Sequence, residues 1–202
     1  GISMERDPVK DLEAFGICFL YAPRYHPAAK KVAPIRKALG VRTVFNLIGP
    51  FLNPTSPERL LLGVPREELL PLFAEAVSEL GVKRALIVYG NGMDELNPIG
   101  SCHVIEVREE KKERSTIDPE ALGLKRCSAK DLEGGSRDEN KGILEKVLGG
   151  EEGAVADTLI LNAGAALYLS EISPTIQEGV KRARKTLKEG KGKALLDQWR
   201  KG

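Results

Sequence analysis

Apolar residues along the chain follow two patterns, short continuous runs and helical repeats. Continuous runs of strand length occur at Gly16–Tyr21 and Ala85–Tyr89, and a third strand is predicted at His103–Val107. Helical spacing of apolar residues predicts five helices, at Ala28–Leu39, Arg66–Leu80, Glu139–Leu148, Ala154–Leu169 and Ile176–Lys188. A run that is apolar throughout is typical of a strand buried on both faces, as in a parallel sheet. The pattern therefore predicts an α/β fold with a central, mainly parallel sheet flanked by helices.

Two predicted helices have a clear apolar face. In the helix predicted at 66–80, the side chains expected to face the core are Leu69, Leu72, Phe73, Ala76, Val77 and Leu80. The basic run 181–201 is interpreted as the polar face of one C-terminal helix. The apolar face of that helix would carry Val180, Leu187, Leu195 and Leu196.

The composition is that of a globular protein with an aliphatic core. Of the 202 residues, 42% are hydrophobic and 30% are charged, which excludes a disordered or collagen-like chain. No segment approaches the roughly 18 consecutive apolar residues of a membrane span. The three cysteines have no CxxC spacing and no secretory signal opens the chain, so we expect a cytoplasmic location. We interpret residues 1–3 as the remnant of a removed tag and 4–202 as the folded domain.

Positive charge is concentrated in one stretch, although the formal net charge is only +2. Residues 21–57 contain no Asp or Glu and six Lys or Arg. Such a stretch is typical of an anion site, but composition alone favours a solvated surface that is offset by acidic segments elsewhere. The small net charge does not favour nucleic acid as a partner.

A buried strand at 85–89 leads into a loop with two adjacent carboxylates, Asp94 and Glu95. In open α/β sheets, ligands bind beyond the carboxyl ends of strands, so this loop is a favoured position for a site. Mg²⁺ commonly takes one or two carboxylates and completes its shell with water and phosphate oxygens. Adjacent acidic residues are also common on surfaces, and the loop lacks the third glycine of a dinucleotide-binding fingerprint. From these residues alone, magnesium binding and a solvated acidic pair both stay open.

A second group of candidate binding residues comprises His26, Arg36, Gly49 and Pro50. An arginine fork binds a carboxylate through two charge-assisted hydrogen bonds, and an imidazole bonds an amine or a carboxylate near neutral pH. The Gly49-Pro50 step lets a rigid backbone pass close to a flat ligand. Each residue also has a structural explanation, as a helix cap, a surface ion pair or a turn. With only two histidines, a His-rich metal cage is excluded.

The segment from His26 to Pro54, with the sequence HPAAKKVAPIRKALGVRTVFNLIGPFLNP, resembles the central signature of anthranilate phosphoribosyltransferases. Gly92–Glu95 and Leu161–Tyr168 follow in the order and roughly the spacing of that family. The resemblance covers nearly the whole chain. It implies a nucleoside phosphorylase/phosphoribosyltransferase-like α/β domain. It also implies transfer of the phosphoribosyl group from phosphoribosyl pyrophosphate to anthranilate, with release of diphosphate, in tryptophan biosynthesis.

The resemblance assigns roles to the amine-substrate residues. Arg36 would bind the anthranilate carboxylate, and His26 would help to hold the aromatic amine. Gly49 and Pro50 would line the substrate channel. The amine would displace diphosphate from ribose C1 directly, so no covalent intermediate is implied.

The resemblance also makes Asp94 and Glu95 the ligands of the Mg²⁺ that accompanies the diphosphate. Mg²⁺ is therefore the expected cofactor. The segment around Asn162 matches a family helix rich in small residues, and we interpret Asn162 as structural.

Parts of the family pattern are absent from residues 1–202. No Gly-Thr-Gly-Gly-Asp and no Lys-His-Gly-Asn sequence occurs, although the family uses such loops to hold the diphosphate and ribose. The helical domain that the family uses for dimerisation is also missing. We therefore expect residues 4–202 to be the C-terminal α/β part of a homodimeric enzyme, with impaired activity alone. Two alternatives stay open, a non-catalytic nucleic-acid-binding relative and a pyrimidine nucleoside phosphorylase of the same fold.

Overall fold

The computed structural model describes residues 1–27, 40 and 47–202. Two compact units divide the chain. The sheet unit comprises residues 57–193, and the terminal unit comprises 194–202 together with the described part of 1–56. Each unit is described by itself. The helix predicted at 28–39 lies outside the described residues.

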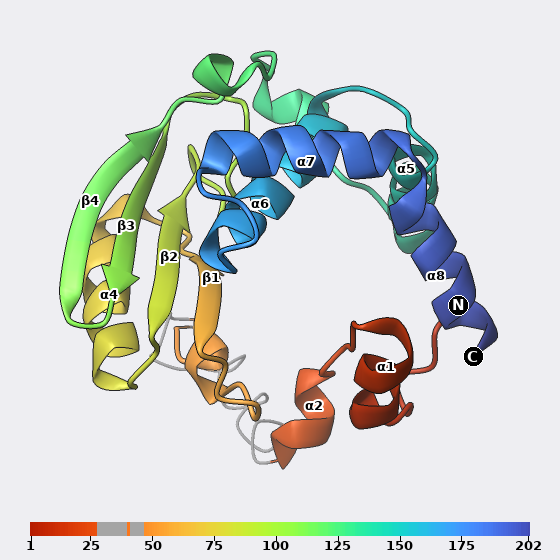
Figure 1. The fold of residues 1–202 in the computed structure, drawn as a ribbon, viewed down its shortest axis with the longest axis horizontal. Coiled ribbons are helices and arrows are strands. Elements are labelled where there is room, and N and C mark those ends of the chain that lie inside the picture. The colour runs from red at the N-terminus through yellow and green to blue at the C-terminus, as the bar shows by residue number, and fades with distance from the viewer. Residues whose placement is uncertain (28–39, 41–46) are drawn as a thin grey trace. The chain divides into compact units, whose positions relative to one another are not determined.

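The sheet unit is built on four strands that lie in the order β1 (Arg59–Gly63), β2 (Arg84–Tyr89), β3 (Cys102–Arg108) and β4 (Lys111–Ile117). β1 and β2 are parallel, whereas β2 pairs with β3 and β3 with β4 in antiparallel fashion (Figure 1). The predicted mainly parallel sheet is therefore mixed in the described residues. For β3 and β4 the cause is local, because only residues 109 and 110 separate them, and a turn that short joins antiparallel strands.

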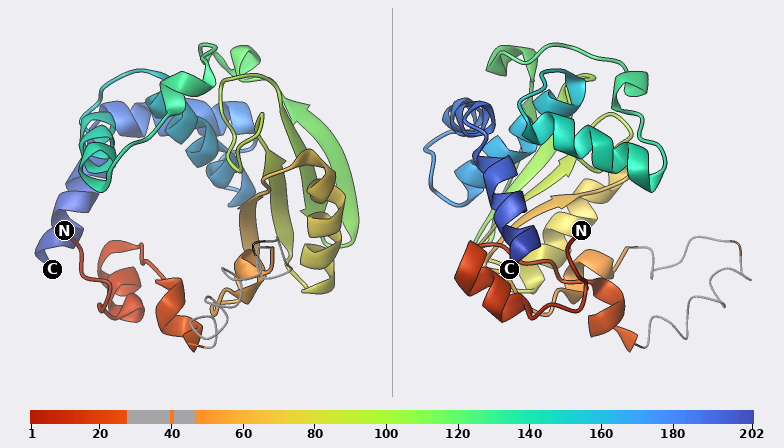
Figure 2. Two further views of the ribbon diagram at one scale, coloured as in Figure 1. Left: turned by 180° about the vertical axis from the view of Figure 1, so that it is seen from behind. Right: turned by 90° about the vertical axis from the view of Figure 1, so that its right-hand side faces the viewer.

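Helices cover both faces of this sheet (Figure 2). On one face, η3 (Glu67–Leu69) leads into α4 (Leu70–Glu79), which packs on β2 and β3. On the other face, α6 (Ala154–Leu169) contacts β1 and β2, and α7 (Ile176–Lys188) lies against α6. These elements confirm the helices predicted at 66–80, 154–169 and 176–188.

The buried face of η3 and α4 differs in part from the predicted one. Phe73 and Val77 are buried, as expected, together with Leu69. The prediction was wrong for Leu72 and Leu80, which are 58% and 60% exposed. Leu70 and Ala74 are buried as well, so the buried positions lie on one side of the helix at spacings of three and four, and Leu72 and Leu80 fall outside it.

A hydrophobic core cluster joins the sheet to α6 and α7. It includes Leu86, Val88, Leu96, Val104, Ile160, Leu161, Ala165 and Val180. α6 and α7 approach each other so closely that a Cβ atom at Gly164 would lie 2.6 Å from the Val180 backbone nitrogen. A Cβ atom at Gly179 would lie 2.2 Å from the Gly164 carbonyl oxygen. The two helices therefore pack backbone to backbone at these glycines.

The basic run at the C-terminus forms two helices, which corrects the prediction of one. After α7 the chain turns through Gly190, whose φ of 67° lies in the left-handed region that ends helices. α8 (Lys191–Lys201) then begins. The remaining described elements of the sheet unit are η4 (Glu120–Leu122), η5 (Ala129–Leu132) and α5 (Arg137–Leu148).

The terminal unit contains α1 (Pro8–Phe15), α2 (Ala22–Tyr25), η2 (Gly49–Leu52) and most of α8. The strand predicted at 16–21 does not form, since a single apolar segment makes no ladder without a neighbouring strand. Asp11 joins α1 to α8, because its carboxylate accepts hydrogen bonds from Arg6 Nε at 2.8 Å and from Trp199 Nε1 at 2.9 Å. The hydrogen bond from Arg6, supported by that from Trp199, lowers the pKa of Asp11. No helix among the described residues is long and apolar enough to cross a bilayer.

Candidate functional site

The loop after β2 reverses its direction within two residues. Gly90 pairs with Met93 through two backbone hydrogen bonds of 3.0 Å. Between them, Asn91 and Gly92 have positive φ angles of 52° and 90°. These are the features of a type I′ hairpin turn, for which Asn-Gly is a favoured dipeptide. After the turn, the chain runs back toward the strand ends, and the segment with Asp94 and Glu95 follows.

The Asp94–Glu95 backbone lies directly against two glycines at the carboxyl ends of the parallel strands. A Cβ atom at Gly63, the last residue of β1, would lie 1.5 Å from the Asp94 carbonyl oxygen. A Cβ atom at Gly90, just after β2, would lie 2.0 Å from the Glu95 carbonyl oxygen. Any side chain at either glycine would displace this segment. The predicted position of the carboxylates, beyond the ends of the strands, is therefore the observed one.

The side chain of Asn97 is hydrogen-bonded to backbone groups of the same loop. Its side chain is fully buried, and its Nδ2 donates to the Gly90 carbonyl at 2.6 Å and to the Glu95 carbonyl at 3.2 Å. Its Oδ1 accepts from the backbone N–H of Ile99 at 3.2 Å. Because a buried amide gains its stability only when it is hydrogen-bonded, these contacts fix the path from Gly90 to Ile99.

The two carboxylates of the loop are exposed and adjacent. The pKa of Glu95 is raised, because partial burial disfavours its charge and the negative charge of Asp94 disfavours it further. A divalent cation would relieve this repulsion. Within the described ranges, no group of three or more His, Cys, Asp or Glu side chains is placed to hold a metal. Mg²⁺ bound by this pair alone would have to take its other ligands from water and substrate oxygens, so the metal role of Asp94 and Glu95 stays a prediction.

The other predicted site residues belong elsewhere in the chain. His26 is half-buried and closes α2, where its backbone N–H donates to the Ala22 carbonyl at 3.0 Å. Gly49 and Pro50 are exposed and begin η2. His26, Gly49 and Pro50 lie in the terminal unit, whereas the carboxylates lie in the sheet unit. Arg36 lies outside the described residues, so the roles of these four amine-substrate residues stay predictions.

Sequence reasoning missed the residues that support the carboxylates. β1 was not predicted, although the apolar run 60–62 before Gly63 is a strand signal. The Asn91-Gly92 dipeptide after an apolar strand is a hairpin signal that could have located the turn. Asn97 gives no comparable signal, because its role depends on burial in the folded chain.

Together these elements define an α/β domain that carries an acidic pair beyond the ends of its parallel strands. Residues 2–193 match the family model described as "Glycosyl transferase family, a/b domain", and the chain belongs to this family. Its curated relatives include anthranilate phosphoribosyltransferases. That of Chlamydia caviae is 42% identical over 203 residues, a match that covers 98% of this chain and 59% of the relative. That of Methanosarcina mazei is 41% identical and is covered over 55% of its length.

Solved structures of the same enzyme share the fold. The anthranilate phosphoribosyltransferase of Thermus thermophilus has a TM-score of 0.88 and 41% identity, with 95% of this chain and 57% of that chain covered. The Saccharomyces cerevisiae enzyme in complex with PRPP and Mg has a TM-score of 0.85 and 28% identity, with 95% and 56% covered. The chain thus spans somewhat more than half the length of the proteins it matches. The resemblance and the phosphoribosyltransferase-like α/β fold are confirmed.

Proposed function

We propose that this chain is the metal- and anthranilate-binding part of an anthranilate phosphoribosyltransferase. That enzyme transfers the phosphoribosyl group from phosphoribosyl pyrophosphate to anthranilate. The observation that carries the proposal is the Asp94–Glu95 pair, which is seated on glycines at the ends of two parallel strands. The names of the curated relatives support the substrates. The yeast structure with PRPP and Mg supports the metal.

Each proposed residue acts by binding and orientation. Asp94 and Glu95 would hold Mg²⁺, which when bound stabilises negative charge on the leaving diphosphate. Arg36 would hold the anthranilate carboxylate in its planar fork, and His26 would help to orient the amine toward ribose C1. Gly49 and Pro50 would shape the channel through which the flat substrate passes.

Neutralising both carboxylates should weaken metal binding. In the double variant Asp94→Asn, Glu95→Gln, we expect the affinity for Mn²⁺, used as a probe for Mg²⁺, to fall by about tenfold or more. Water-proton relaxation during titration with Mn²⁺ alone measures this affinity.

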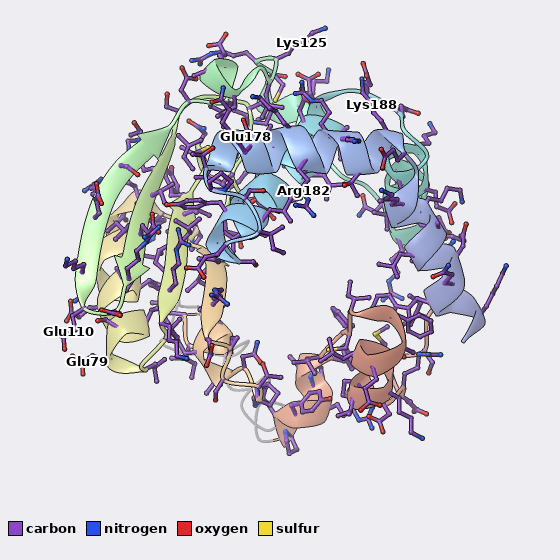
Figure 3. The ribbon with its side chains drawn as sticks, viewed as in Figure 1. Glu79, Glu110, Lys125, Glu178, Arg182 and Lys188 are labelled. Atoms are coloured by element: carbon purple, nitrogen blue, oxygen red, sulfur yellow. The ribbon has the colours of Figure 1, made fainter. Side chains whose placement is uncertain are left out.

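Another pair of adjacent carboxylates, Glu109 and Glu110, provides the control. Glu109 and Glu110 form the turn of the β3–β4 hairpin, where Figure 3 labels Glu110. Glu109→Gln with Glu110→Gln removes the same two charges without touching the site, so Mn²⁺ affinity should stay at the parent value. Undiminished binding in the Asp94 and Glu95 variant would refute this metal assignment.

Anthranilate binding should depend on Arg36. We expect Arg36→Ala to weaken binding by about tenfold or more, because a charge-assisted hydrogen bond contributes roughly 1.5–3 kcal/mol. Arg36→Lys should recover only part of this loss, since lysine lacks the planar fork. Titration calorimetry with anthranilate measures the effect, and Arg66→Ala, which removes an exposed ion pair with Glu68, is the control. Equal binding by the parent and Arg36→Ala would remove Arg36 from the site.

The alternative of nucleic-acid binding has less support. On α7, the helix on which Figure 3 labels Glu178, Arg182 and Lys188, several cations are paired. Lys181 lies 2.8 Å from Glu178, and Lys188 lies 2.9 Å from Glu152. The pyrimidine nucleoside phosphorylase alternative would show phosphorolysis of a nucleoside, and the names of the relatives favour the anthranilate reaction.

The location and the assembly of the enzyme are part of the same proposal. The resemblance supports a homodimer for the intact enzyme, and the cysteine pattern supports the cytoplasm. The cysteines, Cys18, Cys102 and Cys127, are all free thiols, which fits a reducing compartment.

A further inference from the structure

Asn162 is bonded in both directions to the residue that follows the acidic pair. Asn162 lies in the middle of α6, and its Nδ2 donates to the Leu96 carbonyl at 2.7 Å. Its Oδ1 accepts from the Leu96 backbone N–H at 3.2 Å. Nδ2 also donates to the Thr158 carbonyl at 2.8 Å, so both hydrogens of the amide have acceptors.

The Asn162 amide pairs with the Leu96 backbone through one donor and one acceptor, as the backbone of a neighbouring strand would. Leu96 lies outside every strand, yet it is fully buried, and its backbone groups need partners there. Asn162 supplies a donor and an acceptor to the same residue. Asparagine is a poor residue for a helix interior, so local helix stability does not explain its presence.

The bond to Leu96 completes the support of the acidic segment. Gly63 and Gly90 set how closely Asp94 and Glu95 approach the sheet, and Asn97 anchors the Glu95 carbonyl. Asn162 fixes the very next residue to α6. The segment is thus held between the sheet and a helix that is itself packed in the core.

We propose that Asn162 is a positioning residue, which holds the Asp94–Glu95 segment in the geometry that binds the metal. The inference rests on the proposed function for the metal, but the restraint on the segment is independent of it. Groups that orient metal ligands typically change affinity by about 10- to 100-fold when they are removed.

Two variants separate positioning from a general structural role. Asn162→Ala removes all three hydrogen bonds. Asn162→Ser keeps a hydroxyl that can bond the Thr158 carbonyl within the helix but cannot reach Leu96, so it remains informative if the alanine variant unfolds. For both variants we expect about tenfold weaker Mn²⁺ binding and faster amide hydrogen exchange across residues 90–97.

The chain offers a closely matched control in Asn140. Its side chain bonds the backbone of Gly135 in both directions, at 2.9 and 3.1 Å, on the exposed surface of α5. Asn140→Ala therefore removes the same kind of contact far from the acidic pair in the sequence. We expect it to leave both Mn²⁺ affinity and exchange at 90–97 unchanged.

The outcomes are distinguishable. Parent-like Mn²⁺ affinity and parent-like exchange in folded Asn162→Ala or Asn162→Ser would overturn the proposal, as would parent-like affinity with faster exchange. If the Asp94 and Glu95 variant binds Mn²⁺ as the parent does, the metal assignment fails instead. In that case, amide hydrogen exchange across residues 90–97 in the Asn162 variants tests the restraint on the segment by itself. Faster exchange than in the parent supports the restraint, and unchanged exchange refutes it.

Discussion

Gly63→Ala is expected to displace the acidic loop and to abolish metal binding. The new Cβ atom would lie 1.5 Å from the Asp94 carbonyl oxygen, less than half a normal contact distance. The Cβ atom is fixed by the backbone of β1 and its partner is a backbone atom of the loop, so no side-chain rotation relieves the overlap. Because Asn97 and Leu96 hold the far end of the loop, we expect a stability loss of about 3 kcal/mol, at the upper end of overpacking effects.

Two measurements check this prediction. Urea denaturation gives the free energy of unfolding, and Mn²⁺ titration below the transition gives metal affinity in the folded variant. Gly142→Ala serves as the control, because Gly142 lies inside α5 with open space around it. Alanine there should raise stability by up to about 1 kcal/mol and leave metal affinity unchanged. A Gly63→Ala variant with parent stability and parent affinity would show that the contact at Gly63 does not position the carboxylates.

Much of the fold could be predicted from local pattern. Apolar periodicity located α4, α6 and α7, and the continuous run at 85–89 located β2, because burial of one face or both is visible in consecutive residues. The mixed character of the sheet was not predicted. It follows from the short β3–β4 turn, and charged residues there were interpreted only as a solvated hairpin or loop.

The candidate site could be predicted in part for the same reason. Asp94 and Glu95 stand directly after a recognisable strand, so their position followed from chain order. Gly63 and Asn162 contact this segment from far away in the sequence, and neither contact leaves a local pattern. A mid-helix asparagine and a strand-terminal glycine become informative only when packing brings them to the loop.

Gly179→Ala is expected to separate α6 from α7 and to weaken the acidic site through α6. Helix propensity alone predicts the opposite sign, because alanine is favoured over glycine by about 1 kcal/mol in a helix interior. At Gly179 the added Cβ would lie 2.2 Å from the Gly164 carbonyl oxygen, so the backbones must move apart. Overpacking of this kind costs about 1–3 kcal/mol or more, and it outweighs the gain in propensity. Gly164 lies two residues after Asn162 on α6, so a shift of α6 also strains the bond to Leu96.

We therefore expect Gly179→Ala to lower the midpoint of urea denaturation. Because the shift of α6 strains the hydrogen bonds between Asn162 and Leu96, Mn²⁺ affinity should also fall by several-fold. Gly142→Ala is again the matched comparison, since it makes the same chemical change inside a helix without a close neighbour. Opposite signs in the two variants would show that backbone contact, and not helix propensity, determines the effect. Stabilisation by Gly179→Ala would contradict the close packing of α6 and α7. Destabilisation with unchanged Mn²⁺ affinity would confine the effect to the core, because the strain would then not reach Asn162.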